Sequence, residues 1–223
     1  MSDFRSLKGL YIKHVSSDPS NLVEGDIWYN TTTKTLKVAP LISAWSSGNN
    51  MNTARHLFGS TGSQTATLAV AGMTAPGAGV LTICEEYDGT DWAESGDLNT
   101  ARFLAASFGT QTAAACMGGQ LGPTYQSDDT EEYNGTSWTS VEDASQPSFV
   151  TGATGTQTAG LSVAGATASG GNPGVAAPAN ECFEYDGTDW TAGGDYPVST
   201  RSVAACGTQT AALTGGNEPQ LGQ

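Results

Sequence analysis

The residues that most often carry out catalysis or bind metals are scarce in this sequence. It has two histidines, His14 and His56, too few for a mononuclear copper site with histidine ligands or for histidine-based nucleophilic catalysis. We therefore expect no catalytic residue, no metal and no cofactor, and we predict that the chain is not an enzyme. Four cysteines occur without any C-x-x-C spacing: Cys84, Cys116, Cys182 and Cys206. We interpret them as small buried hydrophobic residues, with disulfides and metal ligation as alternatives.

Carboxylates are the one abundant reactive group, with 22 aspartates and glutamates in 223 residues. The string DGTDW from Asp88 to Trp92 is faintly similar to the Asp-box of sialidase propellers, which keeps glycoside hydrolysis among the alternatives. It lacks the leading serine and the residue between Asp and Gly, and it recurs along the chain, which favours a turn. Calcium binding by the loop Ser127-Asp128-Asp129 is an alternative to a solvated loop.

A repeat of about four dozen residues organises most of the chain. The segment EYDGTDW, Glu86 to Trp92, returns as EYNGTSW from Glu132 and as EYDGTDW from Glu184, and Trp45 marks one more copy of its last position. The tryptophans step by 47, 46 and 52 residues. A second marker steps by the same numbers: Gln64, Gln111, Gln157 and Gln209. Two independent markers in one register indicate a repeat architecture.

Each repeat predicts four antiparallel strands. In the second repeat, the run after Arg102 leads through the turn Gly109–Thr112 into a strand that ends at the pair Gly118-Gly119. After a variable loop, a third strand reaches Asn134-Gly135, a hairpin signal because both residues can take positive φ, and the fourth strand carries the tryptophan. The same outer turn is expected at Asp88-Gly89 and Asp186-Gly187. Since no run of apolar residues has helical spacing, we predict an all-β fold.

This pattern resembles the kelch repeat of β-propellers over residues 44–223. The segment LNTAR, Leu98 to Arg102, matches the loop and arginine between kelch blades, although the Tyr-to-Trp spacing is short and Ser148 replaces the third arginine. The resemblance implies structural roles for the recurring residues: Tyr87, Trp92, Tyr133, Trp138, Tyr185, Trp190, Arg55, Arg102 and Arg201. The aromatic pairs would bury apolar area between blades. The arginines would pair with acids such as Asp97 or Asp195.

The repeat yields three complete units and a partial fourth. The fourth begins at Tyr196 and stops after Gly215-Gly216, whereas a propeller usually needs at least four blades to close. We consider three explanations. The chain is part of a longer one, a strand around Leu36 to Trp45 completes the last blade, or a neighbouring subunit does so.

Residues 1–43 do not follow the repeat. They predict a strand from Leu10 and a hairpin from Gly25 to Val38, and the string EGDIWYNTTTKTLKV resembles a short segment near the N-termini of tailed-bacteriophage virion proteins. An unrelated β-hairpin is the alternative. Since so small a β segment cannot bury its own apolar face, we expect an intermolecular contact and an oligomer. The predicted contact residues are Tyr11, Ile27, Trp28 and Tyr29.

Charge divides the chain at the same place. Residues 1–43 hold five basic and four acidic residues, net +1, whereas residues 44–223 hold three arginines and 18 acidic residues, net −15. A surface this acidic repels phosphate backbones and anionic lipids, so we expect no nucleic-acid partner. No apolar run approaches the roughly 18 residues of a membrane span, and the start MSDFR lacks a signal-peptide core, so we expect no membrane insertion.

These observations lead to one functional hypothesis and two alternatives. The hypothesis is a phage-type virion structural protein, made in the host cytoplasm, that docks on other virion proteins through residues 1–43. Its propeller would project as a fibre, appendage or decoration module and contact a host surface glycan or protein through the variable loops. The alternatives are a free kelch-type binding or scaffold module and a carbohydrate-active enzyme.

Overall fold

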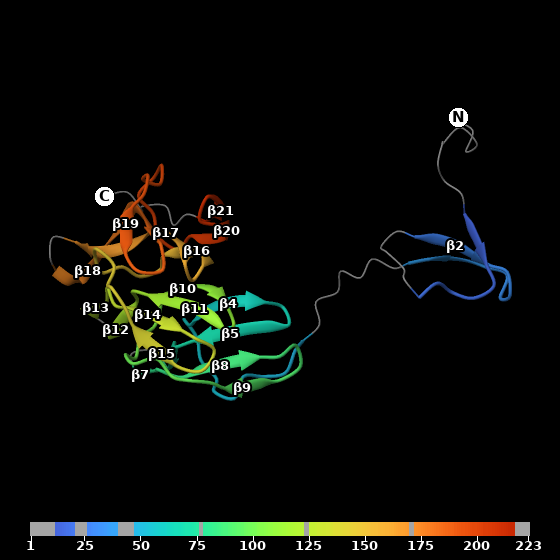
Figure 1. Cartoon of the computed structure of the whole chain (residues 1–223), viewed down its shortest axis with the longest axis horizontal. Coiled ribbons are helices and arrows are strands. Elements are labelled where there is room, and N and C mark those ends of the chain that lie inside the picture. Colours follow the sequence, from blue (N-terminus) through green and yellow to red (C-terminus); the bar gives the residue numbers. More distant parts are fainter. Residues whose placement is uncertain are drawn as a thin grey trace. The chain divides into compact units, whose positions relative to one another are not determined.

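The computed structural model describes residues 12–20, 26–39, 47–75, 78–122, 125–169 and 172–216. All regular structure among them is β, and they contain no helix. The chain divides into two compact units, Met1–Ser47 and Gly48–Gln223. Their boundary lies close to the one expected from charge and periodicity (Figure 1).

The N-terminal unit is a three-stranded sheet. Its strands are β1 (Lys13–Val15), β2 (Ile27–Asn30) and β3 (Thr35–Val38), in the order β1-β2-β3. β2 and β3 form the predicted antiparallel hairpin, and β1 pairs with β2 in parallel. The side-chain oxygen of Asn30 accepts hydrogen bonds from the backbone N–H groups of Thr32 and Thr33, which holds the turn between β2 and β3.

The C-terminal unit contains three four-stranded antiparallel sheets, which confirms the predicted four strands per repeat. The first sheet consists of β4 (Gly59–Ser63), β5 (Ala66–Val70), β8 (Cys84–Tyr87) and β9 (Trp92–Glu94). The second consists of β10 (Ala106–Thr110), β11 (Ala113–Met117), β14 (Thr130–Tyr133) and β15 (Trp138–Ser140). The third consists of β16 (Gly152–Thr156), β17 (Ala159–Ser169), β18 (Asn172–Tyr185) and β19 (Trp190–Ala192).

A hairpin extends each sheet between its second and third strands. In the first sheet it is β6 (Met73–Ala75) with β7 (Ala78–Val80), and in the second it is β12 (Gln120–Gly122) with β13 (Tyr125–Gln126). In the third sheet β17 and β18 themselves continue into it. These hairpins are the segments that the sequence shows as variable loops.

The outer turns fall where the repeat predicts them, but their geometry differs from the expected one. Gly89, Gly135 and Gly187 have positive φ, whereas Asp88, Asn134 and Asp186 do not. Each turn spans four residues between Tyr and Trp, and the Asp or Asn side chain accepts hydrogen bonds from the two backbone N–H groups that follow the glycine. That side-chain acceptor stabilises a longer turn in which only the glycine needs positive φ.

Successive sheets are joined at their first strands. β4, β10 and β16 lie side by side, followed by β20 (Ala204–Thr208), which pairs with β21 (Ala211–Gly215) in a two-stranded fourth sheet. Just before each first strand, a non-glycine residue has φ between 52° and 60°: Leu57, Leu104, Val150 and Ser202. The backbone N–H of each of the last three donates to the carbonyl of the one before it, at 2.8, 3.1 and 3.0 Å. This chain of hydrogen bonds runs from sheet to sheet and holds a backbone conformation that L-residues rarely adopt.

The core of the C-terminal unit lies between the sheets. Tyr133 and Trp138 of the second sheet pack on Leu68 and Val70 of the first. Tyr185 and Trp190 of the third sheet pack in the same way on the second sheet, and both Tyr–Trp pairs are buried. The Tyr–Trp pairs of the second and third sheets therefore join neighbouring sheets.

The four sheets do not close into a ring within the described residues. Of the three explanations for the partial fourth unit, the one that uses a strand around Leu36 to Trp45 fails for its first residues. Leu36 and Val38 already pair with Tyr29 and Ile27 of the N-terminal sheet. Residues 40–46, including Trp45, lie outside the described residues.

Candidate binding surface and the contacts that support it

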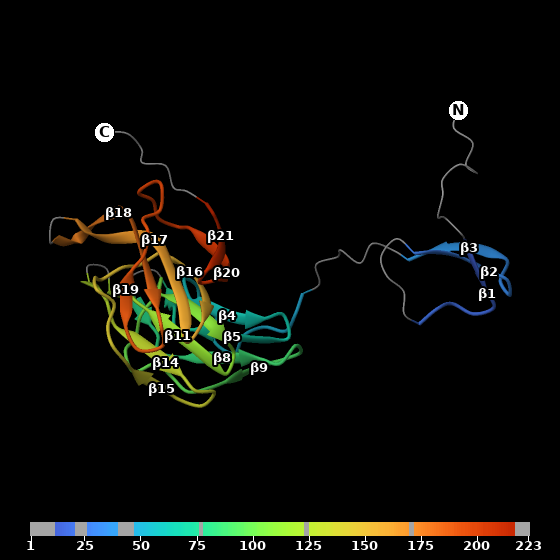
Figure 2. The same cartoon turned by 45° about the horizontal axis from the view of Figure 1, so that its top comes forward.

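The C-terminal unit has two chemically different ends. In an antiparallel sheet, the turns after the first and third strands lie at one end, here called the turn end, and the connections after the second and fourth strands lie at the other, here called the loop end. The loop end carries the strands of the hairpins β6–β7 and β12–β13 and the paired part of β17 and β18 beyond Gly165, which gather on one side of the unit (Figures 1 and 2). Three variable hairpins on three packed sheets form a surface suited to recognition.

Exposed apolar side chains concentrate at the loop end. In the described part of the C-terminal unit, five of the six exposed large hydrophobic residues lie there: Leu57, Phe58, Leu121, Tyr125 and Val198. Tyr125, at 66% exposure on the β12–β13 hairpin, is the most exposed aromatic among them. The sixth, Leu213, lies on β21. An exposed aromatic ring with a polar hydroxyl is suited to sugar rings or to protein surfaces, so the loop end is the candidate binding surface.

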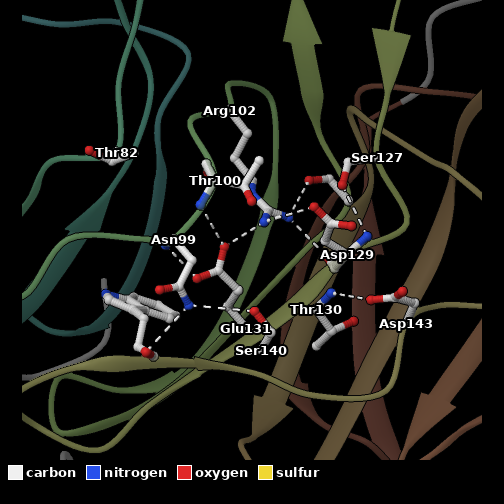
Figure 3. Close-up of polar contacts among 12 residues, drawn as sticks. Thr82, Asn99, Thr100, Arg102, Ser127, Asp129, Thr130, Glu131, Ser140 and Asp143 are labelled. Atoms are coloured by element: carbon white, nitrogen blue, oxygen red, sulfur yellow. Dashed lines mark hydrogen bonds and ion pairs between the residues drawn. The ribbon is translucent and has the colours of Figure 1, made fainter.

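A buried arginine supports the loop end in the second sheet (Figure 3). Arg102 Nη2 lies 2.6 Å from Glu131 Oε1 and 3.4 Å from Asp129 Oδ2, and Arg102 Nη1 donates to the carbonyl oxygens of Gly118 and Asp129. The Glu131 carboxylate also accepts hydrogen bonds from the backbone of Asn99 and Thr100. One guanidinium thus fixes the inter-sheet loop and the base of the hairpin β12–β13.

The same arrangement occurs in the first sheet. Arg55 pairs with Glu85 at 3.0 Å, and Glu85 accepts from the backbone N–H groups of Asn52 and Thr53. The nearest carboxylate to each of Arg55 and Arg102 is therefore a glutamate of its own sheet, whereas the sequence suggested acids such as Asp97 or Asp195. The sequence alone did not identify these glutamates as partners. Glu85 and Glu131 directly precede the recurring Glu-Tyr pair, where they resemble ordinary strand residues.

The third sheet replaces both members of this ion pair. Ser148 stands at the position of Arg102, and Phe183 stands at the position of Glu131. The joint replacement is physically reasonable, because a buried carboxylate without its arginine, or the reverse, is strongly destabilising. In the fourth unit the buried Thr200 occupies this position, because it stands two residues before Ser202 as Arg102 stands before Leu104. Arg201, which the repeat had grouped with Arg55 and Arg102, is half-buried one residue further on.

A glutamine joins each sheet to the one before it. The Nε2 of Gln111 donates to the carbonyl oxygens of Thr67 and Tyr87, at 3.2 and 2.9 Å. Gln157 and Gln209 make the equivalent pairs of hydrogen bonds to the second and third sheets, all between 2.9 and 3.0 Å. The sequence showed this glutamine only as a repeat marker, and the structure explains why a side chain with two N–H groups recurs there.

The recurring aromatic residues also make polar contacts between sheets. Tyr133 donates to Glu86 at 2.8 Å, and Tyr185 donates to Glu132 at 3.0 Å. Burial, together with the hydrogen bond to the carboxylate, raises the pKa of both phenols. Both tyrosines therefore stay protonated donors, which fixes the spacing of adjacent sheets. In the first sheet, Tyr87 and Trp92 are half-buried, and Trp92 Nε1 donates to the carbonyl of Asn49.

The N-terminal sheet has two unlike faces. On one, Asp18 accepts hydrogen bonds from Trp28 Nε1 and Asn30 Nδ2 and pairs with Lys37. Trp28 is buried on this face, and its role at an intermolecular contact stays a prediction. Ile27 and Tyr29 point to the opposite face, as alternation along β2 requires. Tyr11 lies outside the described residues.

Three of the cysteines are buried and one is exposed. Cys84, Cys116 and Cys182 agree with the interpretation as small core residues, whereas Cys206 is exposed on β20. Burial raises the pKa of the Cys84 thiol to about 12 and that of Cys116 to about 11.

In the described part of the chain, no group of three or more histidine, cysteine, aspartate or glutamate side chains could hold a metal ion, and no helix could span a membrane. Asp129 of the proposed calcium loop faces Arg102.

No protein-family model and no curated protein matches this sequence. Solved structures do match. The structure of YjhT superposes with a TM-score of 0.65 at 12% sequence identity, and the match covers 87% of this chain and 69% of that chain. At this identity the likeness shows a shared all-β fold and nothing about activity.

Proposed function

We propose that residues 48–223 are an arc of a kelch-like β-propeller whose loop end is a binding surface, carried as a fibre, appendage or decoration module of a phage-type virion. The observation that carries the binding function is the concentration of exposed apolar residues on variable hairpins at one end of otherwise well-packed sheets. The chain of hydrogen bonds between first strands supports the propeller.

The virion role rests on two further observations. The N-terminal segment resembles those of tailed-phage virion proteins, and it forms a small unit of its own, separate in composition and charge from the acidic C-terminal unit. A separate small sheet at the start of the chain is suited to docking, and the C-terminal unit is suited to display. The proposed partners are other virion proteins on one side and a host surface glycan or protein on the other.

Two experiments test this function. In purified particles of a tailed phage that encodes this chain, mass spectrometry should detect it, and an antibody to residues 48–216 should label one site on intact particles. On an array of bacterial surface polysaccharides, the full chain should bind, and Tyr125→Ala should weaken binding at least tenfold. Thr188→Ala, an exposed turn-end change, is the matched control and should have no effect.

The outcomes separate the alternatives. Absence from particles together with binding that depends on Tyr125 would leave the free binding module as the function. Presence in particles with array binding equally reduced by both variants, or absent, would remove the loop end as a glycan site. Glycoside turnover by the purified chain would favour the enzyme.

A further inference from the structure

The N-terminal sheet presents an uncovered apolar face. Cross-strand partners share a face of a sheet, and the register places Tyr29 opposite Leu36 and His14, and Ile27 opposite Val38. The rings of His14 and Tyr29 lie 5.2 Å apart, in agreement with this assignment. We call Ile27, Tyr29, Leu36 and Val38, together with His14, the apolar face.

The exposure of these residues is high for their type. Leu36 is 61% exposed, Val38 58% and Ile27 43%. The residues between them in sequence, Trp28 and Lys37, point to the other face, where Asp18 accepts hydrogen bonds from both. The polar contacts of this sheet therefore lie on one side, and its exposed aliphatic residues lie on the other.

We infer that the apolar face is an interface between copies of this chain. The inference deepens the proposed function, on which it rests, by adding a second copy of the chain to the virion proteins on which the N-terminal unit docks. The face contains no aspartate, glutamate, lysine or arginine, so two copies can bring the same surface together without burying a charge of either. Two-fold contacts require such a self-complementary patch. Two sheets pack face to face about 10 Å apart, which side chains of this size fill.

The size of the apolar face and the charge of the C-terminal unit determine how strong the self-association is expected to be. The largest apolar patch on a typical monomer measures on the order of 300–600 Å², which is below the roughly 800 Å² per partner of a standard interface. The C-terminal units, with a net charge of −15 over residues 44–223, repel one another. We therefore expect reversible self-association in the micromolar range that strengthens as salt screens the repulsion.

The test is sedimentation equilibrium of the full chain over a range of concentrations. The mass should rise with concentration from that of one chain, 22.8 kDa, towards two or more. Leu36→Lys and Val38→Lys should each weaken association at least tenfold. Leu213→Lys, which places the same charge at an exposed leucine of β21, is the control and should leave it unchanged. The hydrogen-bonded indole resonance of Trp28 should persist in Leu36→Lys and Val38→Lys, which would show that the N-terminal sheet still folds in these variants.

Three results would overturn the inference. They are a single-chain mass at every concentration, an association that Leu213→Lys breaks and Leu36→Lys does not, and a Leu36→Lys variant whose C-terminal unit unfolds more easily, because the face would then cover its own chain. None of these concerns whether the chain is found in particles, so the virion role is judged separately by mass spectrometry.

Discussion

The ring of Phe108 covers Gly160 across the junction between the second and third sheets. A Cβ atom at position 160 would lie 2.2 Å from Cε2 of Phe108, and the ring is held in place by edge contacts with Tyr185 and Trp190. At the other two junctions, the repeat places threonine where Phe108 stands and alanine where Gly160 stands. Thr61 and Thr154 donate to the carbonyl oxygens of Gly109 and Gly207, both at 2.8 Å.

Gly160→Ala should therefore destabilise the C-terminal unit by about 1–3 kcal/mol, because the added methyl group has no room beside a ring that is itself packed. Urea unfolding measures the change. The double variant Phe108→Thr/Gly160→Ala rebuilds the composition of the other junctions. It should be more stable than the two single changes predict together. A neutral Gly160→Ala would show that the ring moves freely.

Cys84→Thr should stabilise the chain by about 1 kcal/mol. Trp190 Nε1 donates to Thr130 at 3.0 Å, whereas the equivalent Trp138 Nε1 is buried without a partner among the described residues. Cys84 occupies the repeat position of Thr130, so a hydroxyl there would accept the indole N–H. Cys182→Thr is the matched control. Cys182 stands at the same repeat position, but no tryptophan of the next unit lies beside it among the described residues. Equal effects of both changes on the unfolding midpoint would contradict this reasoning.

Arg102→Met should cost about 3–5 kcal/mol, because it leaves the buried Glu131 carboxylate without its cation. The third sheet shows how both can be removed together. The double variant Arg102→Ser/Glu131→Phe copies Ser148 and Phe183 and should recover part of the loss. Calorimetric melting of the single and double variants measures the coupling, and strictly additive losses would argue against a paired replacement.

One thiol in four should react rapidly in the native protein. Cys206 is exposed, whereas Cys84, Cys116 and Cys182 are buried, and burial also raises the pKa of Cys84 and Cys116 well above neutral pH. Titration with a chromogenic disulfide should give one fast equivalent in buffer and four in denaturant. Cys206→Ser should abolish the fast phase, and a fast phase that survives this change would place another cysteine at the surface.

Acid should unfold the N-terminal sheet. Hydrogen bonds from Lys37, Asn30 and Trp28 lower the pKa of Asp18 from 3.8 to about 2. A carboxylate with a depressed pKa in the folded state contributes stability above about pH 4 that is lost as the pH falls towards 2. The indole N–H resonance of Trp28, assigned with Trp28→Phe, should lose its hydrogen-bonded shift across this interval. In Asp18→Asn, the shift should be altered at neutral pH and change little with acid.

Much of the C-terminal fold could be read from the sequence because its signals are local and repeated. The four strands per unit, the glycine pair Gly118-Gly119 and the outer turns follow from the chemistry of a few residues at fixed spacing. Tyr133 and Trp138 lie between sheets for a related reason, since these large side chains recur at one position of the repeat. The geometry of that turn was not predicted, because the Asn134 side chain competes with the backbone for its hydrogen bonds.

The sequence by itself determined the repeat, the all-β class and the division into two units, because period, glycine placement and charge are properties of the chain alone. Only the tertiary structure decided the partners. Arg102 pairs with Glu131, 29 residues away, and Gln111 reaches two carbonyls of the preceding sheet. In the N-terminal sheet it likewise decided that Trp28 is buried and Leu36 exposed. The spacing in the sequence shows that such residues recur. Which atoms come into contact depends on how the sheets pack, and the packing depends on contacts between residues far apart in the chain.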